Sequence, residues 1–528
     1  MSDIGNKKTF ALDDDHVMVV IGSGAGGGTL AAELAKKGID VVVLEAGKLT
    51  PRTEFLPDEW ASFTQLAWLD KRTTSGTWRV AKDFPGLPAW ICKTVGGTSV
   101  HWAGAALRIQ PHEFKARTTY GNLPGANLLD WPVTREELDP YYTRAEDKMG
   151  VTRTHGMPGL PGNNNFKVMY GGATKLGYKE CSTGHMAINS TFRDGRNHCF
   201  QRGFCFQGCR YGAKWSTLYT EIPQGQATGH MELRPECHVS RIEHDKTGKV
   251  TAVLYYDASG HLQRQKARAV SVAGNSIETP RLLLLSESSK FPDGLANSSG
   301  QVGRNYLRHT TASVYATFDH QVDMFKGTTM AGIISDESRF DPSRGFVGGF
   351  HMETISLGLA FYSSFLNPGA WGKEFAEAMD GYSRTAGMWI VGEDMPQESN
   401  RITLNHDVKD QFGLPVANVH FDDHPNDTAM RDYGFERGEA VYRAVGARKT
   451  YRVPPYPSTH NLGTCRMSEK PSDGVCNSYG QAHDVPNLFI SDGSQFTTGA
   501  AENPTLTIVT LALRQADHIA AQMHKGAI

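Results

Sequence analysis

The stretch "HVMVVIGSGAGGGTLAAELAKKGIDVVVLEAG", residues 16–47, decides the fold. Its first six residues form an apolar, β-branched run, which is typical of a buried parallel strand. A glycine-rich turn follows, and then a segment of helix-forming residues that ends at Gly38. A second apolar run, "IDVVVL", leads to Glu45. The stretch therefore predicts a strand, a glycine turn, a helix, a second strand and an acidic residue in that order.

The glycines of the turn each have a physical role. Gly22, Gly24 and Gly27 follow the G-x-G-x-x-G spacing. The first permits a tight turn, the second lets the backbone approach a pyrophosphate, and the third lets the helix lie close to the strand. The N-terminus of the helix then faces the phosphates, and Glu45 is placed to accept hydrogen bonds from a ribose diol. We predict dinucleotide binding; the alternative is a glycine-rich turn without a ligand.

Composition excludes several classes of partner. The 528 residues are enough for two to four domains. Lysine and arginine number 54 against 56 acidic residues, without a basic block, which argues against binding to nucleic acid or to an anionic membrane surface. No apolar run approaches the ~18 residues of a membrane span, and the first sixteen residues lack the apolar core of a signal peptide.

Three of the eight cysteines lie close together in "CFQRGFCFQGC", residues 199–209. Eight cysteines in this length are too few for a disulfide scaffold, and the other five are scattered. The cluster of Cys199, Cys205 and Cys209 therefore favours a metal site over a structural disulfide.

The middle of the chain indicates a second domain. Residues 151–190 are rich in Gly, Pro and Asn and are expected to run over the surface. Residues 231–275 predict short strands joined by hairpins, with Gly248 and Gly260 at the turns. Strand-like segments between 310 and 450, with a helix near 426–446, predict an antiparallel substrate domain. Because no repeat or linker separates these parts, the domains are expected to be interleaved in sequence.

The chain resembles the glucose-methanol-choline (GMC) family of flavoproteins over nearly its whole length. Four segments carry the resemblance. They are "VVIGSGAGGGTLAAELAKKGIDVVVLEAG" (19–47), "VGGTSVHWAGAALRIQPHEF" (95–114), "AGNSIETPRLLLLS" (273–286), and the C-terminal pair "STHNLGTCRM" (458–467) and "NLFISDGSQFTTGAAENPTLTIVTLALR" (487–514).

The resemblance implies an α/β plus α+β fold, in which a Rossmann-like FAD-binding domain is interleaved with an antiparallel-sheet substrate-binding domain. The FAD-binding domain would comprise residues 14–110, 200–310 and 455–528, with the cysteine-rich segment at 199–213. Residues 111–199 and 311–454 would form the substrate-binding domain and its connecting excursions.

The resemblance also implies the active-site residues. His460 and Asn503 would be the catalytic pair. A neutral imidazole is suited to remove the hydroxyl proton of an alcohol as hydride leaves for flavin N5, and Asn503 would hold the same oxygen. Contacts to FAD are implied at Gly22, Gly24, Ala25, Gly27, Glu45, Ala46, Gly97, Thr98, His101, Trp102, Ala103, Val239, Ala273, Asp492, Gly493, Asn503, Pro504 and Thr505.

His101 has two interpretations. The stretch "GGTSVHW" resembles the site at which pyranose oxidases attach FAD covalently through a histidine. The alternative is that His101 packs near the isoalloxazine ring without a covalent bond.

The cysteine-rich stretch at residues 199–213 resembles most closely the catalytic subunits of bacterial sugar dehydrogenases, which carry a [3Fe–4S] cluster on three cysteines followed by Gly-Ala. Cys199, Cys205 and Cys209 would be the ligands, with Gly212-Ala213 after them. This sequence has one cysteine at the first position and "RYGA" where those enzymes have "PIGA". Long-chain alcohol-oxidising relatives also have a cysteine-rich segment here. Reduced thiols, or one disulfide and a free cysteine, are the alternatives.

These features together predict an FAD-dependent dehydrogenase that oxidises a hydroxyl group of a sugar, sugar acid or glycoside. Electrons would pass through the cluster to a cytochrome c-type partner. A small companion subunit with the export signal would carry the chain to the periplasm; the alternative is a cytoplasmic protein. The competing hypotheses are an oxygen-using alcohol oxidase on a less polar alcohol, a non-redox lyase, and a flavin-containing assembly subunit.

Overall fold

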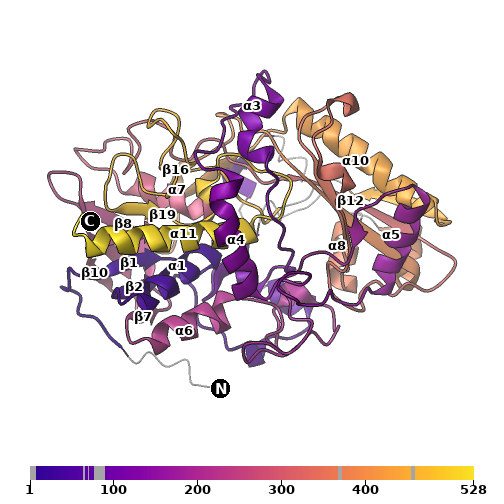
Figure 1. Cartoon of the computed structure of the whole chain (residues 1–528), viewed down its shortest axis with the longest axis horizontal. Coiled ribbons are helices and arrows are strands. Elements are labelled where there is room, and N and C mark those ends of the chain that lie inside the picture. The colour runs from indigo at the N-terminus through magenta and orange to yellow at the C-terminus, as the bar shows by residue number, and fades with distance from the viewer. Residues whose placement is uncertain (1–7, 64–65, 69–70, 77–89, 367–370, 454–457) are drawn as a thin grey trace.

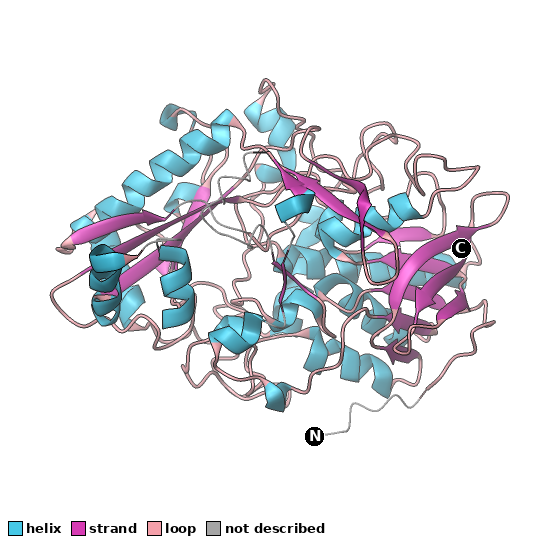
Figure 2. Ribbon diagram, turned by 180° about the vertical axis from the view of Figure 1, so that it is seen from behind, coloured by secondary structure: helices cyan, strands magenta, loops and turns pink. Residues whose placement is uncertain are grey.

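A computed structural model of the chain describes residues 8–63, 66–68, 71–76, 90–366, 371–453 and 458–528. Two lobes lie side by side in Figure 1, one around β1 and α11 and the other around β12 and α10. Seen from behind, each lobe has its own sheet with helices against it (Figure 2).

The first lobe is built on a parallel sheet of five strands in the order β19-β11-β1-β2-β7. The strands are β1 (Met18–Ile21), β2 (Val41–Leu44), β7 (Met231–Arg234), β11 (Ala269–Val272) and β19 (Leu488–Ile490). Helix α1 (Ala25–Lys36) connects the first two. The predicted order of strand, glycine turn, helix and strand is therefore confirmed.

Both faces of this sheet are covered. Alternate residues of β1 and β2 pack against α1, α6 (Glu221–Ala227) and α11 (Thr505–His524), and α4 (Arg135–Met149) contacts α11. The other face packs against an antiparallel meander of β8 (His238–His244), β9 (Val250–Tyr256) and β10 (Leu262–Lys266). Gly248 and Gly260 lie at its turns with positive φ, so the predicted hairpins are confirmed.

The second lobe contains an antiparallel sheet of six strands in the order β18-β12-β15-β14-β13-β6. The strands are β6 (Cys181–Ser182), β12 (Thr310–Thr317), β13 (Ile333–Ile334), β14 (Phe350–Thr354), β15 (Thr385–Gly392) and β18 (Lys449–Val453). Helices α10 (Pro425–Arg443) and α5 (Asn164–Lys175) contact this sheet. The predicted antiparallel sheet in this part of the chain is confirmed, and the helix predicted near 426–446 is α10.

The register of β14 and β15 decides which side chains face the first lobe. Met388 and Ile390 lie against glycines of α10, so their neighbour Trp389 points to the opposite face. Glu353 is directly opposite Trp389 on the adjacent strand, and His351 is opposite Val391. Because side chains alternate along a strand, Trp389, Glu353 and His351 share the face of the sheet that α10 does not cover.

The remaining strands and α-helices lie outside these two sheets and the helices named so far. They are β3 (Leu66–Trp68), β4 (Thr74–Ser75), β5 (Trp90–Cys92), β16 (Arg401–Lys409), β17 (Pro415–His420), α2 (Glu59–Phe63), α3 (Ala116–Tyr120), α7 (Asn275–Leu285), α8 (Leu359–Leu366) and α9 (Gly372–Asp380).

Residues 151–190 differ from the prediction of a surface excursion, because they contain α5 with the buried side chains of Met169 and Ala173. The glycines that suggested a loop serve close packing. A Cβ on Gly172 would lie 2.0 Å from the carbonyl oxygen of Val441, so only glycine lets α5 approach α10 this closely. The division of the chain into two domains at the stated boundaries stays a prediction.

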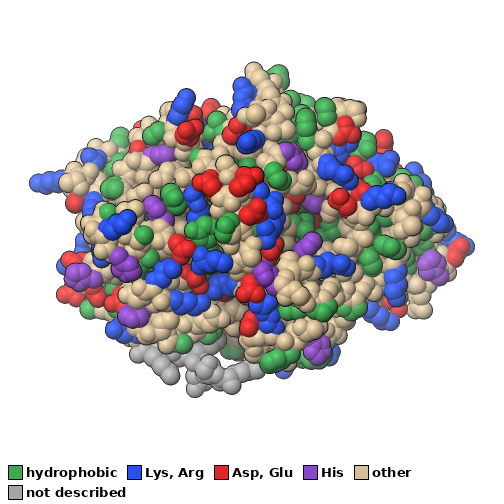
Figure 3. Space-filling view, viewed as in Figure 1, with side chains coloured by type: hydrophobic (Ala, Val, Ile, Leu, Met, Phe, Trp, Pro, Cys, Tyr) green, Lys and Arg blue, Asp and Glu red, His purple; other side chains and the backbone are tan. Residues whose placement is uncertain are grey.

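On the face drawn in Figure 3, acidic and basic side chains are interspersed. None of the helices in the described ranges combines the length and the apolar character that crossing a membrane requires.

Candidate active site

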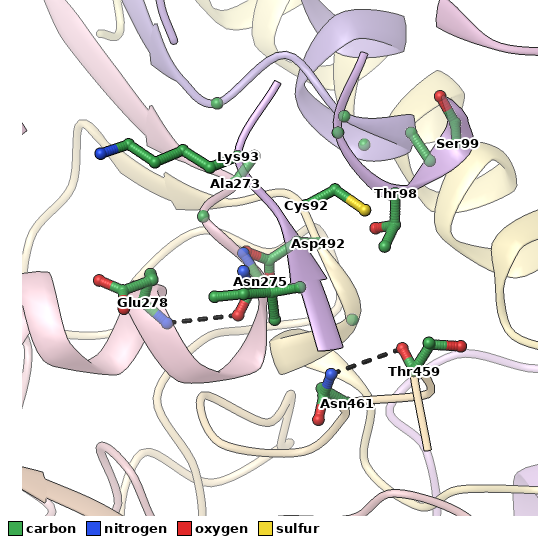
Figure 4. Close-up of a pocket in the computed structure, with 18 of the residues that line it drawn as sticks. Cys92, Lys93, Thr98, Ser99, Ala273, Asn275, Glu278, Thr459, Asn461 and Asp492 are labelled. Atoms are coloured by element: carbon green, nitrogen blue, oxygen red, sulfur yellow. Dashed lines mark hydrogen bonds between the residues drawn. The ribbon is translucent and has the colours of Figure 1, made fainter. Parts of the chain in front are cut away.

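A cavity of about 400 Å³ lies at the carboxyl ends of the parallel strands, where α1 begins. Figure 4 shows Cys92, Thr98, Asn275 and Asp492 around part of this space. The predicted FAD contacts that line the cavity are Gly22, Gly24, Ala25, Glu45, Ala46, Gly97, Thr98, His101, Trp102, Ala103, Val239, Ala273, Asp492, Gly493, Asn503, Pro504 and Thr505. Ligands of open α/β sheets bind at this edge.

Gly27 is not part of the cavity lining, and its surroundings explain why the position is glycine. A Cβ there would lie 2.2 Å from the carbonyl oxygen of Gly22 and 2.9 Å from the Cβ of Ala273. The residue therefore lets α1 pack directly on the sheet, which is the role predicted for the third glycine. Gly22 has φ +99°, a conformation that favours glycine.

The N-terminus of α1 fits a pyrophosphate. No side chain caps Gly24, the residue at its N-cap, and the first turn carries no acidic group. A Cβ on Gly24 would meet only the Cα of Gly97, at 3.8 Å, so open space lies before the helix. Unpaired backbone N–H groups and the positive end of the helix dipole both attract phosphate.

Glu45 follows β2 and lies in the cavity wall, as the sequence predicted. Its Oε2 accepts hydrogen bonds from the backbone N–H of Ser23 at 3.0 Å and from the Ser23 hydroxyl at 2.7 Å, while Oε1 accepts from the N–H of Gly47 at 2.7 Å. Burial raises the pKa of Glu45, and these donors oppose that effect. The carboxyl group is thus held in one orientation beside the glycine turn.

His460 lies in the same cavity, and a second histidine holds its ring. Nδ1 of His460 is 3.0 Å from Nδ1 of His309, and Nε2 of His309 is 3.0 Å from the carbonyl oxygen of Gly499. Since a carbonyl only accepts, His309 donates from Nε2 and accepts at Nδ1. His460 therefore donates from Nδ1 and keeps a free lone pair on Nε2. Burial, with His309 beside it, lowers the pKa of His460 well below its usual range, so the ring is neutral.

Asn503 lies in the cavity wall and is paired with a buried acid. Its amide nitrogen donates to Oε2 of Glu353 at 3.4 Å, and Asn503 and Glu353 are 4% and 0% exposed. Burial raises the pKa of Glu353 to about 7. His460 and Asn503, which lie 43 residues apart in sequence, both line one cavity, as predicted.

His101 connects the cavity to the cysteine-rich segment. Its Nδ1 donates to the carbonyl oxygen of Phe206 at 2.7 Å, which leaves the lone pair on Nε2. Burial lowers the pKa of His101 to about 4. A neutral ring with a free Nε2 is compatible with either interpretation of this residue, covalent attachment or packing.

The three clustered cysteines lie beside a buried lysine. Nζ of Lys214 donates to the carbonyl oxygens of Val100, Trp102 and Cys205 at 2.5 to 2.9 Å, and the residue is 1% exposed. Three carbonyl acceptors need three N–H donors, which only the charged ammonium has. Within the described residues, no Asp or Glu forms an ion pair with Lys214.

Each clustered thiol accepts a backbone N–H. The donors are Gln201 to Cys199 at 3.4 Å, Thr329 to Cys205 at 3.5 Å and Lys214 to Cys209 at 3.5 Å. Burial, with Cys205 and Cys209 nearby, raises the pKa of Cys199 to about 12.

All eight cysteines are free thiols, which contradicts the alternative of one disulfide and a free cysteine. Across the described ranges, no three side chains of His, Cys, Asp or Glu gather closely enough to hold a metal ion. A three-iron cluster binds each thiolate to a different iron, so its ligands stand farther apart than those of one ion. The cluster stays a prediction.

Sequence reasoning missed His309, Glu353 and Lys214. An acid within the buried strand "FHMET" was a usable signal, because carboxyl groups are rarely buried without a role. His309 and Lys214 had no such signal, since their importance comes only from partners far away in sequence.

Residues 75–311 and 396–512 match the N-terminal and C-terminal regions that define the GMC oxidoreductases. The chain belongs to the GMC oxidoreductase family. It is therefore an FAD-dependent oxidoreductase of CH–OH donors, as predicted.

Two curated GMC relatives and one solved structure show how far the similarity extends. The 2-methyl-1,2-propanediol dehydrogenase of Mycolicibacterium austroafricanum is 35% identical, over 96% of this chain and 95% of that one. The fructose dehydrogenase large subunit of Gluconobacter japonicus is 28% identical, over 96% and 98%. The crystal structure of pyridoxine 4-oxidase from Mesorbium loti superposes with a TM-score of 0.67 at 16% identity, over 96% and 99%, which supports the fold.

Proposed function

We propose that this GMC oxidoreductase is a dehydrogenase that oxidises a hydroxyl group of a polyhydroxylated compound, a sugar, sugar acid, glycoside or small diol. Two relatives are named for a diol and for a sugar, both of which carry several hydroxyl groups. Bound FAD supplies the hydride acceptor. Gly22, Gly24 and Glu45 would hold its adenosine and pyrophosphate part, and His101 would lie at its ring.

His460 is the base of the proposed reaction. Its free Nε2 accepts the hydroxyl proton of the substrate as the C–H bond releases hydride, and the alcohol becomes a carbonyl compound. The bond from Nδ1 to His309 supports this role, because it keeps the lone pair on Nε2. Asn503 holds the substrate oxygen and so orients the C–H bond.

Buried Lys214 is the observation that carries the proposed electron acceptor. A buried ammonium without an acidic partner is costly unless negative charge lies nearby. Cys205, Cys209 and, to a smaller extent, Cys92 are the neighbours whose negative charge would stabilise it, and the first two belong to the cysteine cluster. Three thiolates on a [3Fe–4S] cluster would supply that charge, and the N–H donors to Cys199, Cys205 and Cys209 fit such ligands.

The cluster would serve as a one-electron carrier between the flavin and another protein. The hydrogen bond from His101 to Phe206 supports a short route, because Phe206 is the neighbour of Cys205 in the chain. We propose a cytochrome c as the acceptor and a small companion subunit that carries the export signal, which would make the enzyme periplasmic.

Two variants test the proposal. The parent protein should contain about three irons per chain, one for each thiol ligand, and show a paramagnetic resonance signal that disappears on reduction. Cys205→Ser should lose the iron and the transfer to cytochrome, while alcohol still bleaches its FAD anaerobically. His460→Ala should keep FAD and iron but reduce the flavin ~10²–10⁴-fold more slowly.

The alternatives predict other results. An iron-free parent that air reoxidises rapidly would be an alcohol oxidase. A flavin that no alcohol bleaches would favour a lyase or an assembly subunit.

A further inference from the structure

Three buried polar atoms beside the cavity have no hydrogen-bond partner within the described residues. They are Oδ1 of Asn503, Oε1 of Glu353 and Nδ1 of His351. The three residues are 4%, 0% and 2% exposed. Leaving such an atom unpaired costs about 1–3 kcal/mol, so folded proteins rarely do so without a ligand or a water molecule.

The three atoms are all acceptors. Asn503 turns its NH₂ group to Glu353, so its other atom is the carbonyl oxygen. Nε2 of His351 lies 3.3 Å from Oε1 of Glu502, to which it donates, and this leaves the lone pair on Nδ1. Glu353 as a carboxylate accepts at both oxygens. The missing partner must therefore bring hydrogen-bond donors.

The position of these atoms points to the substrate. Glu353 and His351 share one face of the sheet with Trp389, which lies opposite Glu353 and lines the cavity. The ring of Trp389 is 5.8 Å from the ring of His460. Of the three residues, Asn503 lines the cavity. Glu353 lies directly behind it, hydrogen-bonded to Asn503, next to the wall where the hydroxyl proton is removed.

We propose that Glu353, with His351 beside it, binds a second hydroxyl group of the substrate, adjacent to the carbinol that His460 deprotonates. This inference rests on the proposed function and narrows it, because it makes vicinal diols and polyols the preferred substrates over simple alcohols.

A hydroxyl suits this site better than an ammonium. Burial lowers the pKa of His351 and raises that of Glu353 to about 7, so the pair carries less than a full negative charge near neutral pH. A buried ammonium would need that full charge as its partner. A hydroxyl donates one hydrogen bond and needs no counter-charge.

The test compares alcohols that differ at one position. 2-Methyl-1,2-propanediol, 2-methyl-1-propanol and 2-amino-2-methyl-1-propanol share a carbon skeleton, and D-glucose with 2-deoxy-D-glucose forms a second pair. The readout is kcat/KM for anaerobic flavin reduction. The assay is run at pH 8, above the pKa of about 7 of Glu353, where the carboxylate predominates. One hydrogen bond to a charged group contributes about 1.5–3 kcal/mol, so the parent should then prefer the diol, or the intact sugar, by about 10- to 150-fold.

Two variants test whether Glu353 causes the preference for the diol. Glu353→Leu should remove most of it, because the diol should slow more than the simple alcohol; both lose the contact that Glu353 makes with Asn503. Glu353→Gln, which retains an acceptor and similar volume, should keep part of the preference and decides the matter if the leucine variant does not fold. Glu337→Gln is the matched control, because Glu337 is a buried acid whose oxygens are already paired with Tyr178 and Arg344.

The outcomes separate the two proposals. A parent that reduces its flavin equally with both members of each pair, or best with the amino alcohol, overturns the role of Glu353 and leaves the dehydrogenase intact. An unchanged preference in both Glu353 variants also overturns it. A parent that no alcohol reduces refutes the proposed function itself, and this inference with it.

Discussion

Replacing His309 by leucine removes the hydrogen-bond acceptor that orients the proposed base. His309 is fully buried and does not line the cavity, so the substitution leaves the substrate contacts unchanged. In the parent, Nδ1–H of His460 donates to His309 at 3.0 Å. In His309→Leu that N–H is buried without a partner. The other tautomer of His460, in which Nε2 carries the hydrogen and cannot accept a proton, then becomes more populated.

The size of the effect follows from that lost bond. An unsatisfied buried donor costs about 1–3 kcal/mol, which corresponds to about 5- to 150-fold in rate at 1.4 kcal/mol per tenfold. The loss should be smaller than in His460→Ala, because the ring remains beside Trp389. KM should change little, since His309 has no place in the cavity wall.

The assay is anaerobic stopped-flow reduction of the flavin by a saturating alcohol, with FAD content and thermal midpoint measured on the same samples. His309→Gln should recover much of the rate, because its amide can accept from His460 and donate to the carbonyl of Gly499. A folded, yellow His309→Leu protein that reduces its flavin at the parent rate would refute the reasoning.

Three further predictions follow from buried contacts. Lys214→Met should lower both the iron content and the thermal midpoint, whereas Arg210→Met, the same charge change on an exposed neighbour of Cys209, should leave both near parent values; equal losses would contradict the argument from burial. Gly27→Ala should lose FAD on gel filtration and destabilise the fold by about 1–3 kcal/mol or more, since the new Cβ meets backbone at 2.2 Å; retention of FAD would show that α1 can shift. The raised pKa of Glu353, about 7 against 4.5 when unfolded, means that its contribution to stability is present below about pH 4.5 and lost as the pH rises through 7, by up to about 3 kcal/mol. The free energy of unfolding, measured with urea at pH 5 and pH 8, should therefore change less with pH in Glu353→Gln than in the parent. An equal change in both proteins would refute the raised pKa.

The sequence alone determined the features that depend on local rules. The glycine spacing and the apolar runs predicted β1, α1 and β2, because a tight turn, a close helix and a buried strand each restrict the residue types at known offsets. The hairpins at Gly248 and Gly260 followed in the same way from turn chemistry. The motif "THNLGTCRM" and the segment "ENPTLTI" predicted His460 and Asn503 through resemblance, and both line one cavity.

Only the tertiary structure decided the environment of those residues. His309 lies 151 residues before His460, and Glu353 lies 150 before Asn503, so no local pattern could pair them. The protonation of His460 and of Glu353 depends on their burial, and the free lone pair on Nε2 of His460 depends on the carbonyl of Gly499. Lys214 is an ordinary lysine in sequence and becomes a buried cation only because the loop at 100–102 folds over it. Hydrogen-bond partners and desolvation are properties of packed surfaces, and they are absent until the chain has folded.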